Sequence, residues 1–167
     1  MICISKCLGF AACRYNGTIV RDEFLRMLKK RVKFVTRCPE VEIGLGVPRD
    51  PVRIVTGRGG RRLVQPATGL DLTKKMEKKC REILGALPRV DGFILKSRSP
   101  SCGLRDAKIY STPTSAVPVG KGAGFFGSAV LKMFPSLPVE DERRLKNSRR
   151  RERFLTRLFV NRGKRKS

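Results

Sequence analysis

The chain has 167 residues, 40% of them hydrophobic, a size and composition typical of one compact domain with an appended segment. Its 38 Lys and Arg residues outnumber its 14 Asp and Glu residues, which gives a formal net charge of +24, and histidine is absent. The absence of histidine excludes Ser-His-Asp catalysis, Cys-His catalysis and HExxH zinc sites, and no apolar stretch approaches the roughly 20 residues that a membrane span requires.

Apolar patterns in the first part of the chain predict a strand, a helix and a second strand. Ile2–Ile4 is a short apolar run with strand character. Asp22 can cap a helix whose apolar residues recur at helical spacing, namely Phe24, Leu25, Leu28 and Val32. Val32–Val35 predicts the second strand, which ends near Cys38, where Pro39 is expected to take the chain out of regular structure.

The middle of the chain begins with a long loop that contains many glycines and prolines. Within residues 44–60 we expect a short strand at Val52–Val55, which Arg61–Val64 can join as a hairpin. An amphipathic helix is then predicted from Thr73 to Leu87. Its apolar face consists of Met76, Cys80, Ile83 and Leu84.

The next segments complete the predicted domain. Asp91–Leu95 is the third strand, and residues 96–103 form a polar loop of the kind that carries function. A further strand is expected at Ala107–Tyr110 and a helix at Phe125–Met133. This order of elements predicts an α/β fold with a Rossmann-like, mostly parallel sheet in a single domain over residues 1–138.

From residue 139 onward the composition becomes strongly basic, with 12 Lys and Arg residues against four Asp and Glu residues. An apolar stripe runs through this segment and comprises Phe154, Leu155, Leu158 and Phe159. The pattern predicts a basic amphipathic C-terminal tail, residues 139–167, whose helix packs on the core and presents cations to phosphate. A partly disordered, solubilising tail is the alternative, above all for the last five residues.

The charge balance and the cysteines also bear on the partner and the compartment. Such lopsided charge favours nucleic acid as a partner over a heat-adapted surface, in which charges are usually paired. The first ten residues do not form the apolar core of a secretory signal, so we expect a cytoplasmic protein. In a reducing cytosol six cysteines are metal ligands, redox groups or core thiols rather than disulfides.

Three cysteines follow the three predicted strands of the sheet. Cys7, Cys38 and Cys102 would meet at the carboxyl edge if these strands are parallel neighbours, and open α/β folds bind ligands at that edge. Three thiolates without histidine suggest a soft-metal site, in particular an iron–sulfur cluster with one corner unligated. Ordinary buried cysteines are the alternative interpretation.

The other cysteines are less suited to bind metal. No CxxC motif occurs, which argues against zinc ribbons and the usual ferredoxin spacing. Cys80 on a helical apolar face and Cys3 within the first strand are expected to be core thiols. Cys13 shares a loop with Cys7 and is interpreted as a bystander, with a fourth ligand or a persulfide carrier as alternatives.

Three blocks of sequence resemble the signature of the thiouracil desulfidase family, and the last two are specific. They are residues 4–9 with 14–17, residues 38–45 with 47–49, and residues 95–103. The resemblance covers essentially Met1 to Leu137, in the order found in the family. Chance is a poor explanation for three such blocks in order.

The resemblance implies a [4Fe-4S] cluster held by Cys7, Cys38 and Cys102. It also implies an enzyme that removes sulfur, without net redox change, from a thiolated uracil as free base, as nucleotide or within transfer RNA. In that chemistry the substrate's sulfur binds the open iron, water attacks the thiocarbonyl carbon, and sulfur leaves as hydrosulfide. A cluster-bound sulfur carrier for RNA thiolation and a non-enzymatic RNA-binding protein are the alternative functions.

Several residues within the matching blocks are candidates for roles in this chemistry. Glu40 can accept the proton of water, while Ser99 and Ser101 can hydrogen-bond or relay protons. A loop-capping glutamate and turn-forming serines are the alternatives. Residues that could orient a base or its phosphate, or could be solvated charge only, are Arg14, Tyr15, Arg49, Lys96 and Arg98.

Other features modify the resemblance. Asn16 stands where the family suggests an aspartate, and Lys6 replaces a small residue, so the choice of substrate is open. The basic tail resembles the junction to a second domain in longer relatives that act on transfer RNA, and it could hold RNA in place of that domain. Gly122–Gly127 satisfies G-x-G-x-x-G but lies too late in the chain for a dinucleotide site, so we expect it to flank the cluster site or to receive one phosphate.

Overall fold

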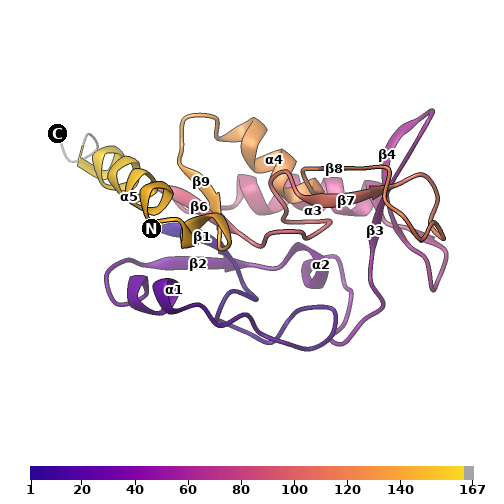
Figure 1. The fold of residues 1–167 in the computed structure, drawn as a ribbon, viewed down its shortest axis with the longest axis horizontal. Helices are drawn as coiled ribbons and strands as arrows, with labels where there is room; N and C mark the ends of the chain where they lie inside the picture. Colours follow the sequence, from indigo (N-terminus) through magenta and orange to yellow (C-terminus); the bar gives the residue numbers. More distant parts are fainter. Residues whose placement is uncertain (164–167) are drawn as a thin grey trace.

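The computed structural model describes residues 1–163, with side chains described through Val160. Its first sheet has four parallel strands in the order β2 (Phe34–Arg37), β1 (Ile2–Ser5), β6 (Gly92–Leu95) and β9 (Val139–Asp141) (Figure 1). All four strands therefore end at the same edge of the sheet. This arrangement confirms the predicted mixed α/β fold with a parallel sheet.

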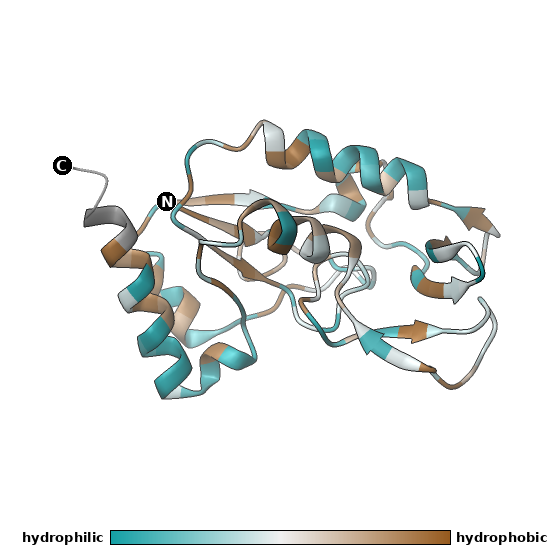
Figure 2. Ribbon diagram, turned by 90° about the horizontal axis from the view of Figure 1, so that it is seen from above, coloured by the Kyte–Doolittle hydropathy of each residue, from teal (hydrophilic) through white to brown (hydrophobic). Residues whose placement is uncertain are grey.

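The alternation of side chains along the strands separates the two faces of this sheet. Ile2 and Ile4 pack against α1 (Glu23–Leu28) and α5 (Ser148–Gly163). Cys3 points to the opposite face, toward α3 (Thr73–Gly85) and α4 (Phe125–Met133). Figure 2 shows hydrophobic residues along these strands and mostly hydrophilic ones along α5, as expected for an outer layer.

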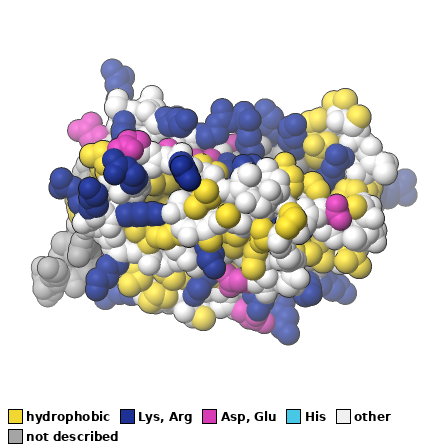
Figure 3. Space-filling model, turned by 90° about the horizontal axis from the view of Figure 1, so that it is seen from below, with side chains coloured by type: hydrophobic (Ala, Val, Ile, Leu, Met, Phe, Trp, Pro, Cys, Tyr) yellow, Lys and Arg dark blue, Asp and Glu magenta, His cyan; other side chains and the backbone are white. Residues whose placement is uncertain are grey.

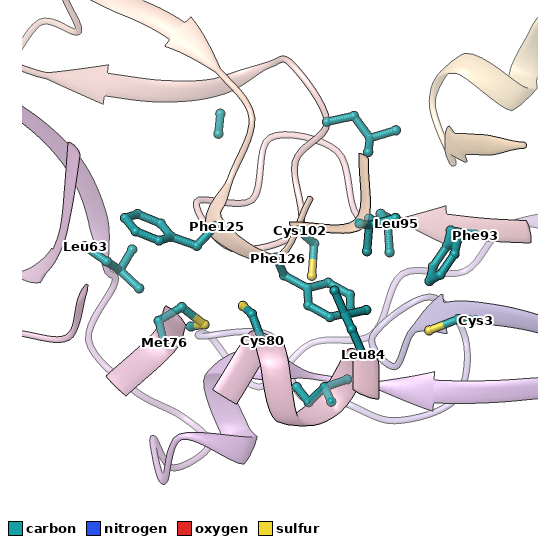
Figure 4. Close-up of a cluster of buried hydrophobic side chains, with 14 of the residues drawn as sticks. Cys3, Leu63, Met76, Cys80, Leu84, Phe93, Leu95, Cys102, Phe125 and Phe126 are labelled. Atoms are coloured by element: carbon teal, nitrogen blue, oxygen red, sulfur yellow. The ribbon is translucent and has the colours of Figure 1, made fainter. Parts of the chain in front are cut away.

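A second sheet of five strands packs on the α3 and α4 side of the molecule. Its order is β5 (Leu70–Asp71), β4 (Gly60–Gln65), β3 (Arg53–Gly57), β7 (Ala107–Tyr110) and β8 (Gly120–Gly122). Only β3 and β7 pair in parallel. One continuous core joins the two sheets through the helices, and Figure 4 shows Leu63 of β4, Met76 of α3, Phe126 of α4 and Phe93 of β6 within it.

Most of the predicted elements are confirmed, and the differences have local causes. The second strand begins at Phe34 rather than Val32, because the Val32 amide still bonds the Leu28 carbonyl at the end of the α1 segment. Pro39 does not leave regular structure but begins the short helix α2 (Pro39–Glu42), since a first helical residue needs no amide donor. The short strands β5, β8 and β9 were not predicted.

The C-terminal segment is part of the fold. Residues 139–141, which the sequence interpretation placed in the tail, form β9, and the 3-10 turn η1 (Arg144–Lys146) leads into α5. Phe154 and Leu158 of the predicted stripe are buried against the sheet, whereas Phe159 is exposed. Residues 164–167 lie outside the described part of the chain. No helix among residues 1–163 is long and apolar enough to cross a membrane.

Candidate functional site

A cavity of 380 Å³ lies at the carboxyl edge of the first sheet, where the loops after β1, β2 and β6 meet. All eleven residues that the sequence singled out for a site line this cavity. They are Cys7, Arg14, Tyr15, Cys38, Glu40, Arg49, Lys96, Arg98, Ser99, Ser101 and Cys102. The fold thus brings together residues that are up to 95 positions apart in the sequence.

Each of three strands delivers one cysteine to the cavity. Cys7 follows the end of β1 by two residues, and Cys38 directly follows β2 as the N-cap of α2. Cys102 lies in the longer loop after β6. The thiols of Cys7 and Cys102 are buried, and that of Cys38 is partly buried, so the protein shields all three from bulk water.

The glycine motif before α4 fixes the loop that carries Cys102. Backbone amides of residues 124–127 donate to the carbonyl oxygens of Pro100, Ser101 and Gly103 over 2.8–3.1 Å. A Cβ atom on Gly124 or Gly127 would overlap this loop's backbone, which explains why the motif is glycine at both positions. This contact agrees with the prediction that the motif flanks the site. The amides at the N-terminus of α4 already donate to the carbonyl oxygens of the loop, so they are not available to bind a phosphate.

A carboxylate is held at the cavity by an arginine and a serine. Glu40 Oε2 accepts hydrogen bonds from Arg49 Nε at 2.9 Å and Nη2 at 2.6 Å, and Glu40 Oε1 accepts one from Ser101 Oγ at 2.8 Å. Arg49 also donates to the carbonyl oxygens of Cys13 and Gly46, both at 3.1 Å. Glu40 is only 9% exposed, so this network holds a buried carboxylate against Ser101, the residue before the ligand candidate Cys102.

Ser99 has a different position from Ser101. Its Oγ accepts hydrogen bonds from the backbone amides of Ser101 at 3.2 Å and Cys102 at 2.9 Å. These bonds form a side-chain-capped turn, the alternative considered for the serines of this loop. Arg98, the third residue after β6, has a positive φ of 59° in this turn, and its amide donates to Asp106.

A second buried carboxylate fixes the beginning of the same loop and was not selected from the sequence. Glu142 accepts hydrogen bonds from Lys96 Nζ at 2.5 Å, Ser97 Oγ at 2.7 Å and the Ser97 amide at 2.8 Å. Lys96 lines the cavity, and Glu142 holds its ammonium group in place. The amide of Lys96 also donates to Ser5 Oγ, which ties the loop to β1.

The charged residues in the rest of the cavity lining are all cations. Lys6, Arg37 and Arg143 line it in addition to Arg14 and Arg98. Arg37 Nε is buried and has no hydrogen-bond partner among the described residues. With Glu40 bound to Arg49, the cavity presents a positive potential suited to an anionic or electron-rich ligand.

The environment of the thiols strongly favours their protonated forms when no metal is present. Burial raises the pKa of Cys7 and of Cys38 to about 12, and the neighbouring Cys13 thiol adds to the effect at both. Burial also raises the pKa of Cys102 well above its usual value, against a hydrogen bond from Ser5. At neutral pH a metal centre must therefore displace protons from these thiols when it binds.

The donor set fits a soft, polynuclear cofactor. Three thiols from three loops face one cavity, yet within residues 1–163 no group of three or more His, Cys, Asp or Glu residues could hold a single metal ion. Sulfur donors spaced around a cavity suit an iron–sulfur cluster better than one zinc ion. Cys13 also lines the cavity, and its carbonyl oxygen contacts Cys38 Sγ at 3.9 Å, whereas Cys3 and Cys80 are in the core as predicted.

Comparison with known proteins points to one family. The profile of the 2-thiouracil desulfurase family matches residues 2–142. YbbK of Bacillus subtilis (strain 168), described as uncharacterised, is 36% identical over 110 residues, which cover 62% of this chain and 73% of YbbK. A solved structure, the [4Fe-4S]-dependent thiouracil desulfidase TudS, is similar with a TM-score of 0.64 and 29% identity, over 87% of this chain and 92% of TudS. Because the family profile spans most of the chain and includes all three cysteine loops, the chain belongs to the 2-thiouracil desulfurase family.

Proposed function

We propose that the protein is a [4Fe-4S]-dependent desulfidase that hydrolyses the C–S bond of a thiolated uracil without net redox change. The observation that carries this proposal is the convergence of Cys7, Cys38 and Cys102 on a cavity that also holds the carboxylate of Glu40. Membership in the family and the similarity to TudS support the same chemistry.

The three thiols are assigned as the ligands of the cluster. Cys7, Cys38 and Cys102 would hold a [4Fe-4S] cluster, which would supply a Lewis-acidic iron suited to the sulfur of a thiocarbonyl group. Replacement of sulfur by oxygen then requires water to lose its protons while hydrosulfide leaves, so the protein must provide a proton acceptor near the reacting carbon.

Glu40 is the group best placed to accept a proton from water. Arg49 binds Oε2 through two nitrogens and so fixes the orientation of the carboxylate, while Oε1 faces Ser101. Ser101 can relay a proton to Oε1 through its hydroxyl group. We assign Ser99 to the geometry of the loop, because its Oγ already accepts two backbone amides.

Two arginines and a tyrosine that line the cavity are assigned to substrate binding. Arg14, Tyr15 and Arg98 lie at the cavity without a carboxylate partner among the described residues, so they can orient a nucleobase or an attached phosphate. Tyr15 is 43% exposed, and its ring offers a surface on which a base could stack. Lys96, held by Glu142, can stabilise negative charge that develops on the leaving sulfur.

The ligand assignment is tested by anaerobic purification and reconstitution of single variants. Cys7→Ala, Cys38→Ala and Cys102→Ala are each expected to lose most of the iron and acid-labile sulfide. The matched control Cys80→Ala removes a buried core thiol and is expected to retain both. Full iron content in all three ligand variants would contradict the assignment.

The catalytic assignment is tested by release of hydrosulfide from thiouracil. Glu40→Gln is expected to keep the cluster and to lower turnover by about 100-fold or more, which is the usual contribution of a general base. Turnover on thiolated free bases, nucleotides and RNAs then identifies the form of the substrate. A variant with wild-type turnover would exclude Glu40 as the proton acceptor.

A further inference from the structure

Two helices lie side by side on the outer face of the first sheet. The guanidinium group of Arg151 in α5 stacks over the ring of Phe24 in α1, with 5.1 Å between its central carbon and the ring centroid. Leu25 of α1 and Phe154 and Leu158 of α5 are buried in one cluster with β1. The two helices therefore form one continuous surface, called here the α1–α5 face.

The α1–α5 face carries many cations that are free to bind an external anion. Eight exposed Lys and Arg side chains from α1, α5 and their adjoining turns form no ion pair within residues 1–163. They are Arg21, Lys30, Arg31, Lys33, Lys146, Arg149, Arg150 and Arg153. Figure 3, which looks from the side of α1, shows Lys and Arg side chains prevailing over Asp and Glu on that side of the molecule as a whole.

The acidic residues on this face offset little of its charge. Glu23 is paired with Arg26 at 2.5 Å, and Asp22 accepts the Leu25 amide as the N-cap of α1. Glu152 is a single carboxylate among four neighbouring arginines of α5. The face therefore has the electrostatic character of a surface that binds a polyanion.

The α1–α5 face is connected to the cavity by one short segment. Arg143 lines the cavity, and Lys146, three residues later, lines a cleft between α1 and α5. The other residues that line the cleft are Arg21, Asp22, Glu23, Phe24, Leu145 and Arg151. The turn η1 between Arg143 and Lys146 thus reaches from the mouth of the cavity to the cleft. A polymer bound on the α1–α5 face can place one of its units at the cavity.

We propose that the α1–α5 face binds the phosphate backbone of RNA, so that a thiolated uridine reaches the cavity while it is still part of an RNA strand. This inference rests on the proposed function, because uracil is the RNA base and the cavity is assigned to thiolated uracil. RNA is favoured over an anionic membrane because the segment from Arg143 to Lys146 joins this face to the cavity, which is assigned to a nucleobase. The counterion release that accompanies such binding makes the affinity fall steeply with salt.

The helix α3 offers a matched control surface. It presents the exposed cations Lys74, Lys75, Lys78 and Arg81 on the other side of the first sheet. No residue of α3 lines the cavity. Lys78 lies 4.0 Å from Glu82 in an exposed pair, and the other three cations form no ion pair within the described residues. General attraction between a basic protein and RNA would therefore also use this surface.

Two holoprotein variants with equal loss of charge test the proposal. The face variant combines Lys30→Gln, Arg31→Gln, Arg149→Gln and Arg150→Gln. The control variant combines Lys74→Gln, Lys75→Gln, Lys78→Gln and Arg81→Gln. Their affinity for an unstructured, uridine-rich RNA is measured by fluorescence anisotropy over a series of KCl concentrations.

Log affinity falls as log salt rises, and the face variant is expected to make this dependence less steep by about 3, because it removes four cations and each single-strand phosphate contact contributes about 0.7. The corresponding loss of affinity near 0.15 M salt is about 100-fold, and the control variant is expected to stay within about twofold of the wild type. An equal loss in both variants, or no loss in the face variant, would overturn the proposal. Binding to vesicles of anionic phospholipid that equals binding to RNA, and is lost in the face variant, would also overturn it.

Turnover separates this inference from the proposed function. The face variant is expected to release hydrosulfide from free thiouracil at the wild-type rate, but from thiouridine within RNA more than tenfold more slowly. RNA affinity is measured without turnover, so a protein that binds RNA through this face and releases no sulfide contradicts the proposed function and not the assigned surface.

Discussion

The buried pair of Lys96 and Glu142 gives the sharpest test of how the cavity is supported. We expect Glu142→Gln to lower the free energy of unfolding of the metal-free protein by about 3 kcal/mol. The carboxylate is 5% exposed and accepts three hydrogen bonds from Lys96 and Ser97. Removal of one partner from a buried ion pair costs about 3–5 kcal/mol, and the lower end applies because Lys96 remains 17% exposed and can gain water.

Equilibrium unfolding in urea, under anaerobic and reducing conditions, measures this change. Glu23→Gln is the matched control, because it breaks an ion pair with Arg26 whose side chains are 68% and 63% exposed, and such pairs contribute less than about 1 kcal/mol. In the double variant with Lys96→Met, the cost should be smaller than the sum of the single costs by about 1 kcal/mol or more. A loss below about 1 kcal/mol for Glu142→Gln, or additive single costs, would refute the reasoning.

Three further predictions follow from the core and the site. Gly127→Ala should destabilise the protein by about 3 kcal/mol in thermal unfolding, because the new Cβ atom would overlap the loop of Cys102. The control Gly85→Ala places its Cβ atom in open space and should change the stability by less than about 1 kcal/mol. Above pH 9 the free energy of unfolding of the metal-free protein should fall, because burial raises the pKa of Cys80 to about 12 and the unfolded chain loses this proton at lower pH than the folded chain. Cys80→Ala should reduce this decrease by about 1.4 kcal/mol per pH unit between pH 9 and 12. An unchanged dependence of the unfolding free energy on pH would contradict the raised pKa. Arg49→Lys should retain iron but lower hydrosulfide release at least tenfold, because a lysine cannot bind Glu40 and two carbonyl oxygens at once, and full turnover would show that Glu40 needs no such support.

The parts of the fold that could be predicted were those with a strong local pattern. The helix from Thr73 and the strand Ala107–Tyr110 begin where their periodicity begins. Cysteines placed after predicted strands were enough to indicate one cavity, because the carboxyl ends of neighbouring parallel strands meet at one edge. The strand Gly120–Gly122 has no such pattern, and its pairing with β7 defines it.

The residues that were missed depend on contacts between distant segments. Glu142 belongs to a run of charged residues that is typical of a solvated tail, yet β9 carries it to Lys96, 46 positions earlier in the chain. Arg37 looks like a polar end of a strand, and only the meeting of three loops turns it toward the cavity. Composition alone cannot distinguish such buried charges from exposed ones, because their burial is decided by tertiary pairing.

The distribution of the three cysteine loops along the chain has a consequence for biogenesis. Cys7 emerges from the ribosome long before Cys102, and the loop of Cys102 is held by the later helix α4. No early fragment can therefore supply all three of the proposed cluster ligands, and we expect iron to be inserted only after most of the polypeptide has been synthesised and folded. On this assignment, the topology of the chain makes insertion of the cluster a late step of maturation.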